Sequence, residues 1–170
     1  MFTLMRALTY AVFFMGFVLV FLPGQLLQWS GVTRPSHIGV PQIAGACLVI
    51  LGGGLALWCI AAFAVVGRGT PAPFDPPRRL VVSGPYHFVR NPMYAGAGLA
   101  LGGAAVFYQS VVLAGYTLLF FAVTHWFVRG YEEPILRDSF GPDYEAYCRR
   151  VRRWWPIPPV DGRERKPTCS

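Results

Sequence analysis

Three long stretches of the chain contain no charged side chain. Residues 7–33, 38–67 and 91–128 include no Asp, Glu, Lys or Arg. The hydrocarbon core of a bilayer is about 30 Å thick, so a helix that crosses it needs about 20 residues. Because lipid offers no hydrogen-bonding partner to an open backbone, each crossing has to be helical. The pattern predicts a first span at residues 7–27 and a second at residues 41–66.

The third apolar stretch, residues 91–128, is too long for a single crossing. Its 38 residues would form a helix of about 57 Å, nearly twice the depth of the hydrocarbon core. The most polar point within it is the Tyr-Gln-Ser sequence at residues 108–110. A turn there leaves two arms, residues 92–107 and 111–128. We therefore expect a tight helical hairpin.

Small residues mark places where the predicted helices can approach one another. Gly98 and Gly102 stand four positions apart, and residues 52–54 are a run of three glycines. In membranes, such small residues allow two helix backbones to come close. We interpret both groups as helix-packing sites.

A different pattern begins after residue 142. Apolar side chains recur at helical spacing while charged ones occupy the other positions, which predicts an amphipathic helix lying against the membrane interface. Its apolar members are Tyr144, Tyr147, Cys148 and Val151. Trp154 and Trp155 follow, and such aromatics are typical interfacial anchors.

The sequence thus predicts an all-α integral membrane protein with about four transmembrane helices. The last two form the tight hairpin, and a cytoplasmic amphipathic helix follows them. We treat residues 1–160 as a single domain and the polar residues 161–170 as a flexible tail. Two polar segments, residues 67–94 and 129–156, lie between and after the spans.

Composition and charge support this class. Hydrophobic residues make up 54% of the chain and charged residues 14%. The formal charge is +7, but nearly all arginines flank the apolar stretches or lie in the final segment, so we expect no nucleic acid partner. Arg6 precedes the first span, whereas only Arg34 separates the first two. The positive-inside rule then places both termini and both polar segments on the cytoplasmic side of a bacterial inner membrane.

The first polar segment ends in a helix start. Asn91 can accept hydrogen bonds from free amides, and Pro92 fits the first helical position. The positive end of the helix dipole then lies beside Arg90, where an anionic group would be stabilised. The alternative is that Asn91 and Pro92 only cap a helix. The four cysteines have no spacing suited to zinc or a redox centre, so we predict no metal site.

The second polar segment contains a stripe of ionisable groups. His125, Arg129 and either Glu132 or Glu133 fall on one face of a helix that leaves the membrane. Ionisable groups at such depth usually face the protein interior, so the stripe is a candidate site. The alternative for Arg129 is that it extends to the headgroups.

Several motifs stand in order along the second half of the chain. They are Leu-Val-Val-Ser-Gly-Pro-Tyr at 80–86, Arg-Asn-Pro-Met-Tyr at 90–94, Glu-Glu-Pro-Ile-Leu at 132–136, Phe-Gly-Pro-Asp-Tyr at 140–144 and then residues 147–156. This half of the chain resembles the membrane methyltransferases that include isoprenylcysteine carboxyl methyltransferases and phospholipid N-methyltransferases. The resemblance implies S-adenosyl-L-methionine as cofactor, in a cytoplasmic pocket built by both polar segments. The implied cofactor contacts are Leu80, Val81, Tyr86, Asn91, Pro92, Met93, Tyr94 and Glu132.

The acceptor is less closely defined. The resemblance implies that Arg129 lies on the substrate side, but the isoprenylcysteine enzymes usually have His where this chain has Asn91. Methyl transfer needs alignment rather than a nucleophilic residue. Glu133 or His125 would take the proton of an amine acceptor, and Arg129 would hold a carboxylate. A phospholipid amine, an isoprenoid carboxylate, a quinone-like phenol and a small thiol all remain open.

The residue chemistry agrees with the implied sulfonium cofactor, because Glu132, Tyr86 and Tyr94 can supply charge and cation–π attraction. A site between helices at the membrane interface is reached most easily from the bilayer, so we expect a lipophilic or prenylated acceptor and membrane lipids as partners. Two alternatives are a nicotinamide-dependent membrane reductase and a non-catalytic membrane binding or transport subunit. The chain is short for the reductases, and its polar side chains gather at one face and are scarce within the spans, unlike those of a transport subunit.

Overall fold

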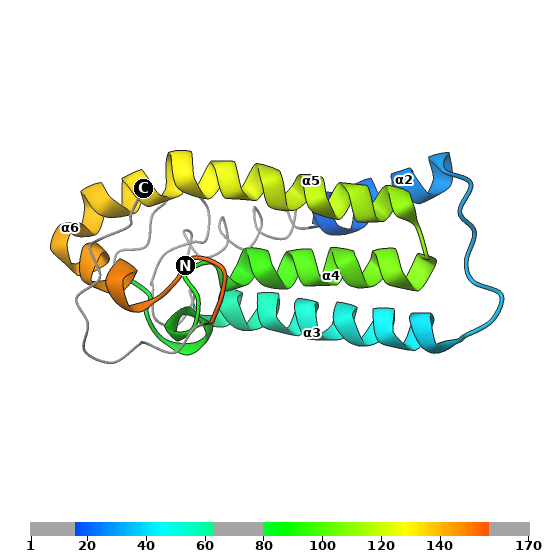
Figure 1. The fold of residues 1–170 in the computed structure, drawn as a ribbon, viewed down its shortest axis with the longest axis horizontal. Coiled ribbons are helices and arrows are strands. Elements are labelled where there is room, and N and C mark those ends of the chain that lie inside the picture. The colour runs from blue at the N-terminus through cyan, green and yellow to red at the C-terminus, as the bar shows by residue number, and fades with distance from the viewer. Residues whose placement is uncertain (1–15, 63–79, 157–170) are drawn as a thin grey trace, which may run out of the picture.

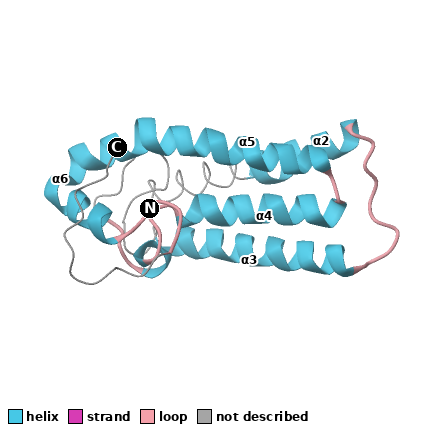
Figure 2. Cartoon of the chain, in the orientation of Figure 1, coloured by secondary structure: helices cyan, strands magenta, loops and turns pink. Residues whose placement is uncertain are grey.

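The computed structural model describes residues 16–62 and 80–156, and the elements in this part are helices without any β-strand (Figures 1 and 2). In chain order they are η1 (Phe17–Phe21), α2 (Leu22–Trp29), α3 (Val40–Ala62), η3 (Gly84–His87), α4 (Pro92–Tyr108), α5 (Val111–Phe127), η4 (Val128–Glu132) and α6 (Glu133–Arg150). The predicted all-α class is confirmed. The start of the first predicted span, the end of the second, much of segment 67–94 and the tail at 161–170 lie outside the described residues.

Helices α3, α4 and α5 lie side by side along the long axis of the molecule, with α2 beside the start of α5 (Figure 1). Two described helical stretches are long and apolar enough to cross a bilayer: α3, and the continuous helix Val111–Arg150 through its apolar first part. Both expose large apolar side chains, among them Leu57 on α3 and Leu118 on α5. This agrees with a membrane protein. That the chain crosses four times stays a prediction.

The contact between α3 and α4 is the closest in the bundle, because glycines face the opposite backbone. A Cβ atom added to Gly45 would lie 2.7 Å from the carbonyl oxygen of Gly103, and one added to Gly52 would lie 2.5 Å from that of Gly96. Each helix places its two glycines seven residues apart, which is almost two full turns. The two antiparallel backbones therefore touch along one straight seam.

The glycines singled out from the sequence are used differently. The close approach expected at Gly52 is confirmed, but a Cβ atom added to Gly53 or Gly54 would meet nothing within 4 Å. Gly98 faces the ring of Phe121 on α5 and not a helix backbone. Gly98 therefore packs against a side chain of the next helix, and close approach of two backbones is found on the face that α4 turns toward α3.

The turn between α4 and α5 lies at the predicted residues 108–110. Gln109 adopts a left-handed conformation (φ 49°, ψ 38°), which ends α4. The Ser110 side chain then caps α5 by accepting a hydrogen bond of 3.3 Å from the backbone N–H of Leu113. The predicted helical hairpin is thus present.

The long helix beyond α5 turns back at the end of the bundle. Gly141 (φ 47°, ψ −123°) breaks α6, and the chain changes direction there (Figure 1). Tyr144 and Tyr147 follow on the predicted apolar face, but they are buried within the protein against Leu80 and Phe140. The expectation that this face lies on the membrane interface was therefore wrong. This face packs against the protein's own loop at Leu80.

Candidate functional site

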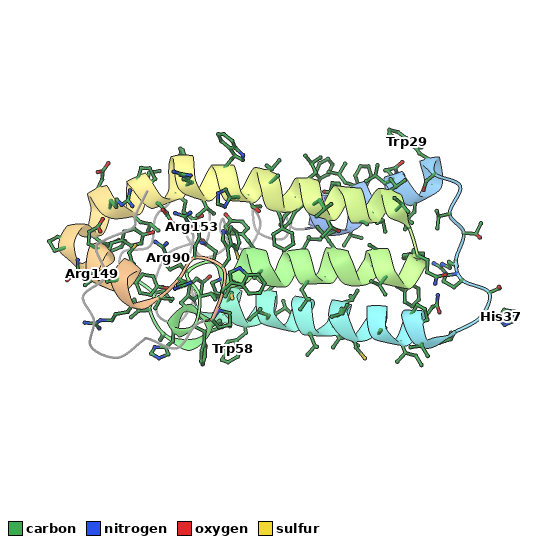
Figure 3. The ribbon with its side chains drawn as sticks, in the orientation of Figure 1. Trp29, His37, Trp58, Arg90, Arg149 and Arg153 are labelled. Atoms are coloured by element: carbon green, nitrogen blue, oxygen red, sulfur yellow. The ribbon has the colours of Figure 1, made fainter. Side chains whose placement is uncertain are left out.

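The chain before α4 and the chain after α6 pair with each other at one end of the bundle. The backbone N–H of Arg90 donates to the carbonyl oxygen of Arg152 at 2.8 Å, and that of Asn91 donates to the carbonyl oxygen of Arg153 at 3.3 Å. The Tyr147 hydroxyl donates to the Tyr86 carbonyl oxygen at 2.6 Å. Figure 3 shows Arg90 and Arg153 together at this end, far from Trp29 and His37. The two polar segments therefore meet, as the sequence predicted.

A buried cluster of one carboxylate and two guanidinium groups joins these segments. Glu133 is 3% exposed, and Arg153 grips both its oxygens, with Nε 2.7 Å from Oε1 and Nη2 2.8 Å from Oε2. Arg90 Nη1 lies 3.3 Å from the same Oε1 and donates to Cys148 Sγ at 2.7 Å. A fork-to-carboxylate pair fixes orientation as well as charge. Glu133 thus holds the segment that follows α6 against the start of α4.

Glu132, the preceding residue, lies in a different environment. The Tyr94 hydroxyl donates to its Oε2 at 3.3 Å, and within residues 16–62 and 80–156 it forms no ion pair. The pKa of Glu132 is raised to about 7, mainly by burial; the hydrogen bond from Tyr94 lowers it, and the charge of Glu133 contributes a smaller increase. Glu132 lies beyond α5, outside the apolar spans. It is a carboxylate that a cation would stabilise.

A cavity of about 750 Å³ lies between α4 and α5, close to this polar end. Its wall is mostly apolar, with Thr117 and His125 as the polar members on α5 and Trp154 and Trp155 from the chain after α6. The indole Nε1 of Trp154 donates to Nδ1 of His125 at 3.3 Å. The Thr117 hydroxyl donates to the Leu113 carbonyl oxygen at 2.8 Å. Apolar pockets with few polar groups are typical of ligand sites.

Several cofactor residues implied by the sequence are packed in cores. Val81 and Tyr86 are buried with Cys59, and Met93 packs against them. Leu80 packs against the cluster of Tyr144 and Tyr147. These side chains shape the loop that leads into α4.

Asn91 and Pro92 are also buried, and Asn91 Nδ2 donates to the Arg153 carbonyl oxygen at 3.5 Å. Asn91 does stand at the cap position of α4, although its side chain makes no capping bond there. Among the residues implied for the cofactor, Tyr94 and Glu132 are the pair whose polar side-chain groups meet directly.

The predicted stripe of ionisable groups is spread out in the structure. His125 lines the cavity, Arg129 is exposed on η4, and Glu133 is buried in its ion pairs. The π-helical turn η4 lies within this stripe and interrupts the regular α-helical spacing. No group of three or more His, Cys, Asp or Glu side chains suited to a metal ion occurs in the described part of the chain.

Sequence reasoning missed Arg153 and Trp154 as members of this site. Arg153 is one of several arginines between positions 149 and 153, and its partner Glu133 is 20 residues away. Trp154 was interpreted as a membrane anchor, yet it lines the cavity and donates to His125. Helical spacing predicts neither the partner of Arg153 nor the partner of Trp154, because Gly141 reverses the chain between the two members of each pair.

Comparisons with known proteins agree with the motifs. The family model described as phospholipid methyltransferase matches residues 40–143. The nickel-cobalt-cadmium resistance protein NccN of Alcaligenes xylosoxydans xylosoxydans is 27% identical over 129 residues, which cover 76% of this chain and 54% of that protein. The cobalt-zinc-cadmium resistance protein CzcN of Cupriavidus metallidurans is 28% identical over 129 residues, with the same coverage. The chain therefore spans about half the length of these curated relatives. No solved structure matches.

Proposed function

The chain belongs to the phospholipid methyltransferase family, and from this premise we propose that it transfers a methyl group from S-adenosyl-L-methionine to a lipid-like or prenylated acceptor. The reaction takes place at the cytoplasmic surface of a bacterial inner membrane. Family membership supports methyltransferase chemistry in general, and the two long apolar helices support a membrane location. The cofactor, the acceptor and the orientation are our proposals.

The contact between Tyr94 and Glu132 is the observation that carries the proposal. When bound, S-adenosyl-L-methionine supplies an electrophilic methyl carbon on a positively charged sulfur. A partly buried carboxylate without an ion pair in the described part of the chain suits such a cation, and the Tyr94 ring can add cation–π attraction. The residues present therefore fit the cofactor.

The other implied cofactor residues have a shaping role in this proposal. Leu80, Val81, Tyr86 and Pro92 are packed in the loop and at the first turn of α4, so they hold the backbone that faces the cofactor. Asn91 ties this backbone to Arg153, and Met93 lies at the edge of the same core. Alignment of two reactants is the main contribution a protein makes to such a transfer.

The acceptor binds in the apolar cavity between α4 and α5. Its hydrocarbon part lies against the helix side chains, and its reacting group lies near His125. We retain Arg129 as the group that meets a negatively charged headgroup, since it is exposed on η4 one turn beyond His125. Glu133 fixes Arg153 in this arrangement and is not the proton acceptor.

Titration calorimetry on the purified protein in nanodiscs tests the proposal. S-adenosylhomocysteine should bind, and reduced nicotinamide dinucleotide should not. Glu132→Gln should weaken S-adenosylmethionine binding at least tenfold, because a lost charge-assisted contact costs about 1.5–3 kcal/mol. The control is Glu145→Gln, which removes a half-buried carboxylate paired with Arg137 at 3.1 Å and should change little.

Binding of the dinucleotide in place of S-adenosylhomocysteine would instead establish a reductase, and binding of neither would favour a non-catalytic subunit. Equal effects of the two substitutions would remove the role given to Glu132. Both relatives are named as metal resistance proteins, so survival on nickel or cobalt salts is a physiological readout for the same pair of variants.

A further inference from the structure

We propose that Trp154 fixes the tautomer of His125 so that His125 donates a hydrogen bond to an oxygen atom of the acceptor. The acceptor is then a carboxylate or phenolate with a hydrocarbon tail, and not an amine. This inference rests on the proposed function and deepens it, because it names the class of molecule that occupies the cavity between α4 and α5.

The contact between the two rings sets the position of the imidazole hydrogen. Trp154 Nε1 lies 3.3 Å from His125 Nδ1, and the rings stack with centroids 6.3 Å apart and an interplanar angle of 29°. An indole nitrogen can only donate. Nδ1 must therefore carry the lone pair, and the hydrogen of the neutral ring is on Nε2. For an occupant of the cavity, His125 is a donor and not a base.

Trp154 is itself held in place from several sides. Its neighbour Arg153 is fixed by both oxygens of Glu133, and the Arg153 carbonyl oxygen accepts from Asn91. The rings of Trp154 and Phe121 on α5 meet edge to face at a centroid distance of 6.3 Å. The orientation of His125 is thus determined by the buried cluster that joins the two polar segments, and Trp154 and Arg153 are positioning residues.

The wall of the cavity suits an oxygen anion with a long apolar tail. Among the described side chains that line it, none is acidic, so they offer no countercharge to an alkylammonium group, and a donor on His125 Nε2 would oppose one. The wall follows α4 from Ala95 to Val106, a rise of about 16 Å. The Thr117 hydroxyl hydrogen is already used within α5. Among the described lining side chains, His125 and the indole N–H of Trp155 are therefore the donors at the polar end of this wall, and His125 is the one whose orientation is fixed by a neighbour.

The methyl-transfer step then needs no general base. A carboxylate is ionised before it binds, and a phenol, with a pKa of about 10, gives its proton to water before the step. The anionic oxygen donates its lone pair to the methyl carbon, and an O–CH₃ bond forms. The carbon–sulfur bond breaks with its electron pair going to sulfur, which yields a methyl ester or ether and neutral S-adenosylhomocysteine. No proton is transferred, so a histidine that orients the oxygen is sufficient.

The tautomer is tested first, without any reaction. Nitrogen NMR of the protein labelled at histidine should show His125 with its hydrogen on Nε2, and Trp154→Phe should convert it to a mixture of tautomers. Trp126→Phe is the matched control, because Trp126 is 79% exposed on α5 and should leave the spectrum unchanged. A hydrogen on Nδ1 in the unmodified protein would overturn the inference.

The acceptor class is tested with dodecanoate, 4-dodecylphenol and dodecylamine as probes. The first two should bind and take up radiolabelled methyl groups, and His125→Leu should weaken their binding about tenfold or more. His125→Gln, which restores an N–H donor but not a base, should recover most of that loss. Methylation of dodecylamine in preference to the oxygen probes, or equal defects in the Gln and Leu variants, would overturn the inference.

The two proposals fail in different ways. If S-adenosylhomocysteine does not bind, the proposed function is wrong, whatever the probes do. If it binds and the methyl group is transferred to the amine, the proposed methyltransferase function is retained and the proposed role of His125 is wrong. If it binds but no probe takes up a methyl group, binding of the oxygen probes to the Gln and Leu variants decides the inference.

Discussion

Glycines on the two faces of α4 have opposite effects on the packing of the neighbouring helix. Toward α3, Gly96 and Gly103 bring the two backbones into direct contact. Toward α5, Gly98 and Gly102 border a cavity of about 750 Å³. At 100° per residue the first pair falls on one side of the helix and the second pair on the other. Helix α4 therefore packs tightly against α3 and leaves a cavity on the side of α5.

The neighbouring helix decides which outcome a glycine has. Helix α3 presents Gly45 and Gly52 opposite the glycines of α4, so nothing separates the backbones. Helix α5 presents the larger Phe121 and Thr117, which hold it away. In lipid, helices gain little from burying apolar surface, so close backbone packing carries much of the association. We expect α3 and α4 to supply stability, and the space between α4 and α5 to supply function.

The largest expected effect is a loss of stability when a substitution breaks the α3–α4 contact. In Gly52→Ala the new methyl group would lie 2.5 Å from the Gly96 carbonyl oxygen and 2.6 Å from the Ala100 nitrogen. These are backbone atoms, so the helices have to separate, at a cost of about 1–3 kcal/mol or more. Thermal unfolding in detergent should show a markedly lower midpoint.

Gly54→Ala is the control for this experiment, since its methyl group would meet nothing within 4 Å. Its midpoint should stay close to that of the unmodified protein, because such surface substitutions usually stay within about 0.5 kcal/mol. A similar loss in both variants would mean that glycine at residues 52–54 matters for the helix itself and not for the contact.

A smaller effect, on function and not on folding, is expected on the other face of α4. A Cβ atom at Gly102 would lie 3.9 Å from Thr117 Cγ2, which is ordinary contact, so Gly102→Leu can place its side chain in the cavity. Folding should be retained, while binding of a lipophilic acceptor such as dodecanoate weakens about tenfold. S-adenosylhomocysteine affinity should not change. If Gly102→Leu unfolds the protein as Gly52→Ala does, the contrast between the two faces is wrong.

Much of this arrangement could be predicted from the sequence, and the limit has a physical cause. The turn at residues 108–110 and the start of α3 follow from polarity and length, which are local properties. Small residues predict that helices approach, but they do not say which helix is the partner. For that reason Gly52 was assigned correctly, whereas Gly98 was assigned to backbone packing and faces Phe121.

The site shows the same limit. The motifs indicated Tyr94 and Glu132 as members of one site, and the structure places their oxygens 3.3 Å apart. The pairing of Glu133 with Arg153 depends on the chain reversal at Gly141 and on which of several nearby arginines reaches the carboxylate. Helical spacing carries no information on either point.

Two adjacent carboxylates, Glu132 at the end of η4 and Glu133 at the start of α6, extend the comparison. Glu133 is neutralised by Arg90 and Arg153. Glu132 meets the hydroxyl of Tyr94, and its pKa is raised to about 7 by burial. One carboxylate thus stabilises the structure, and in our proposal the next one stabilises a bound cation. The pH dependence of cofactor binding can separate these roles.

The smallest effect we expect is therefore a change of cofactor affinity with pH. A cation binds to the ionised form of Glu132, and the raised pKa means that this form grows as pH rises through about 7. With a pKa of about 7, the ionised fraction increases roughly tenfold between about pH 6 and pH 8, so affinity for S-adenosylmethionine should rise severalfold. S-adenosylhomocysteine has a neutral sulfur but the same amino and carboxyl groups, so its affinity should rise less.

Calorimetry at both pH values with both ligands measures the difference, and Glu132→Gln should abolish it. A difference that survives in Glu132→Gln would assign the titrating group elsewhere and would leave Glu132 without the role that distinguishes it from Glu133.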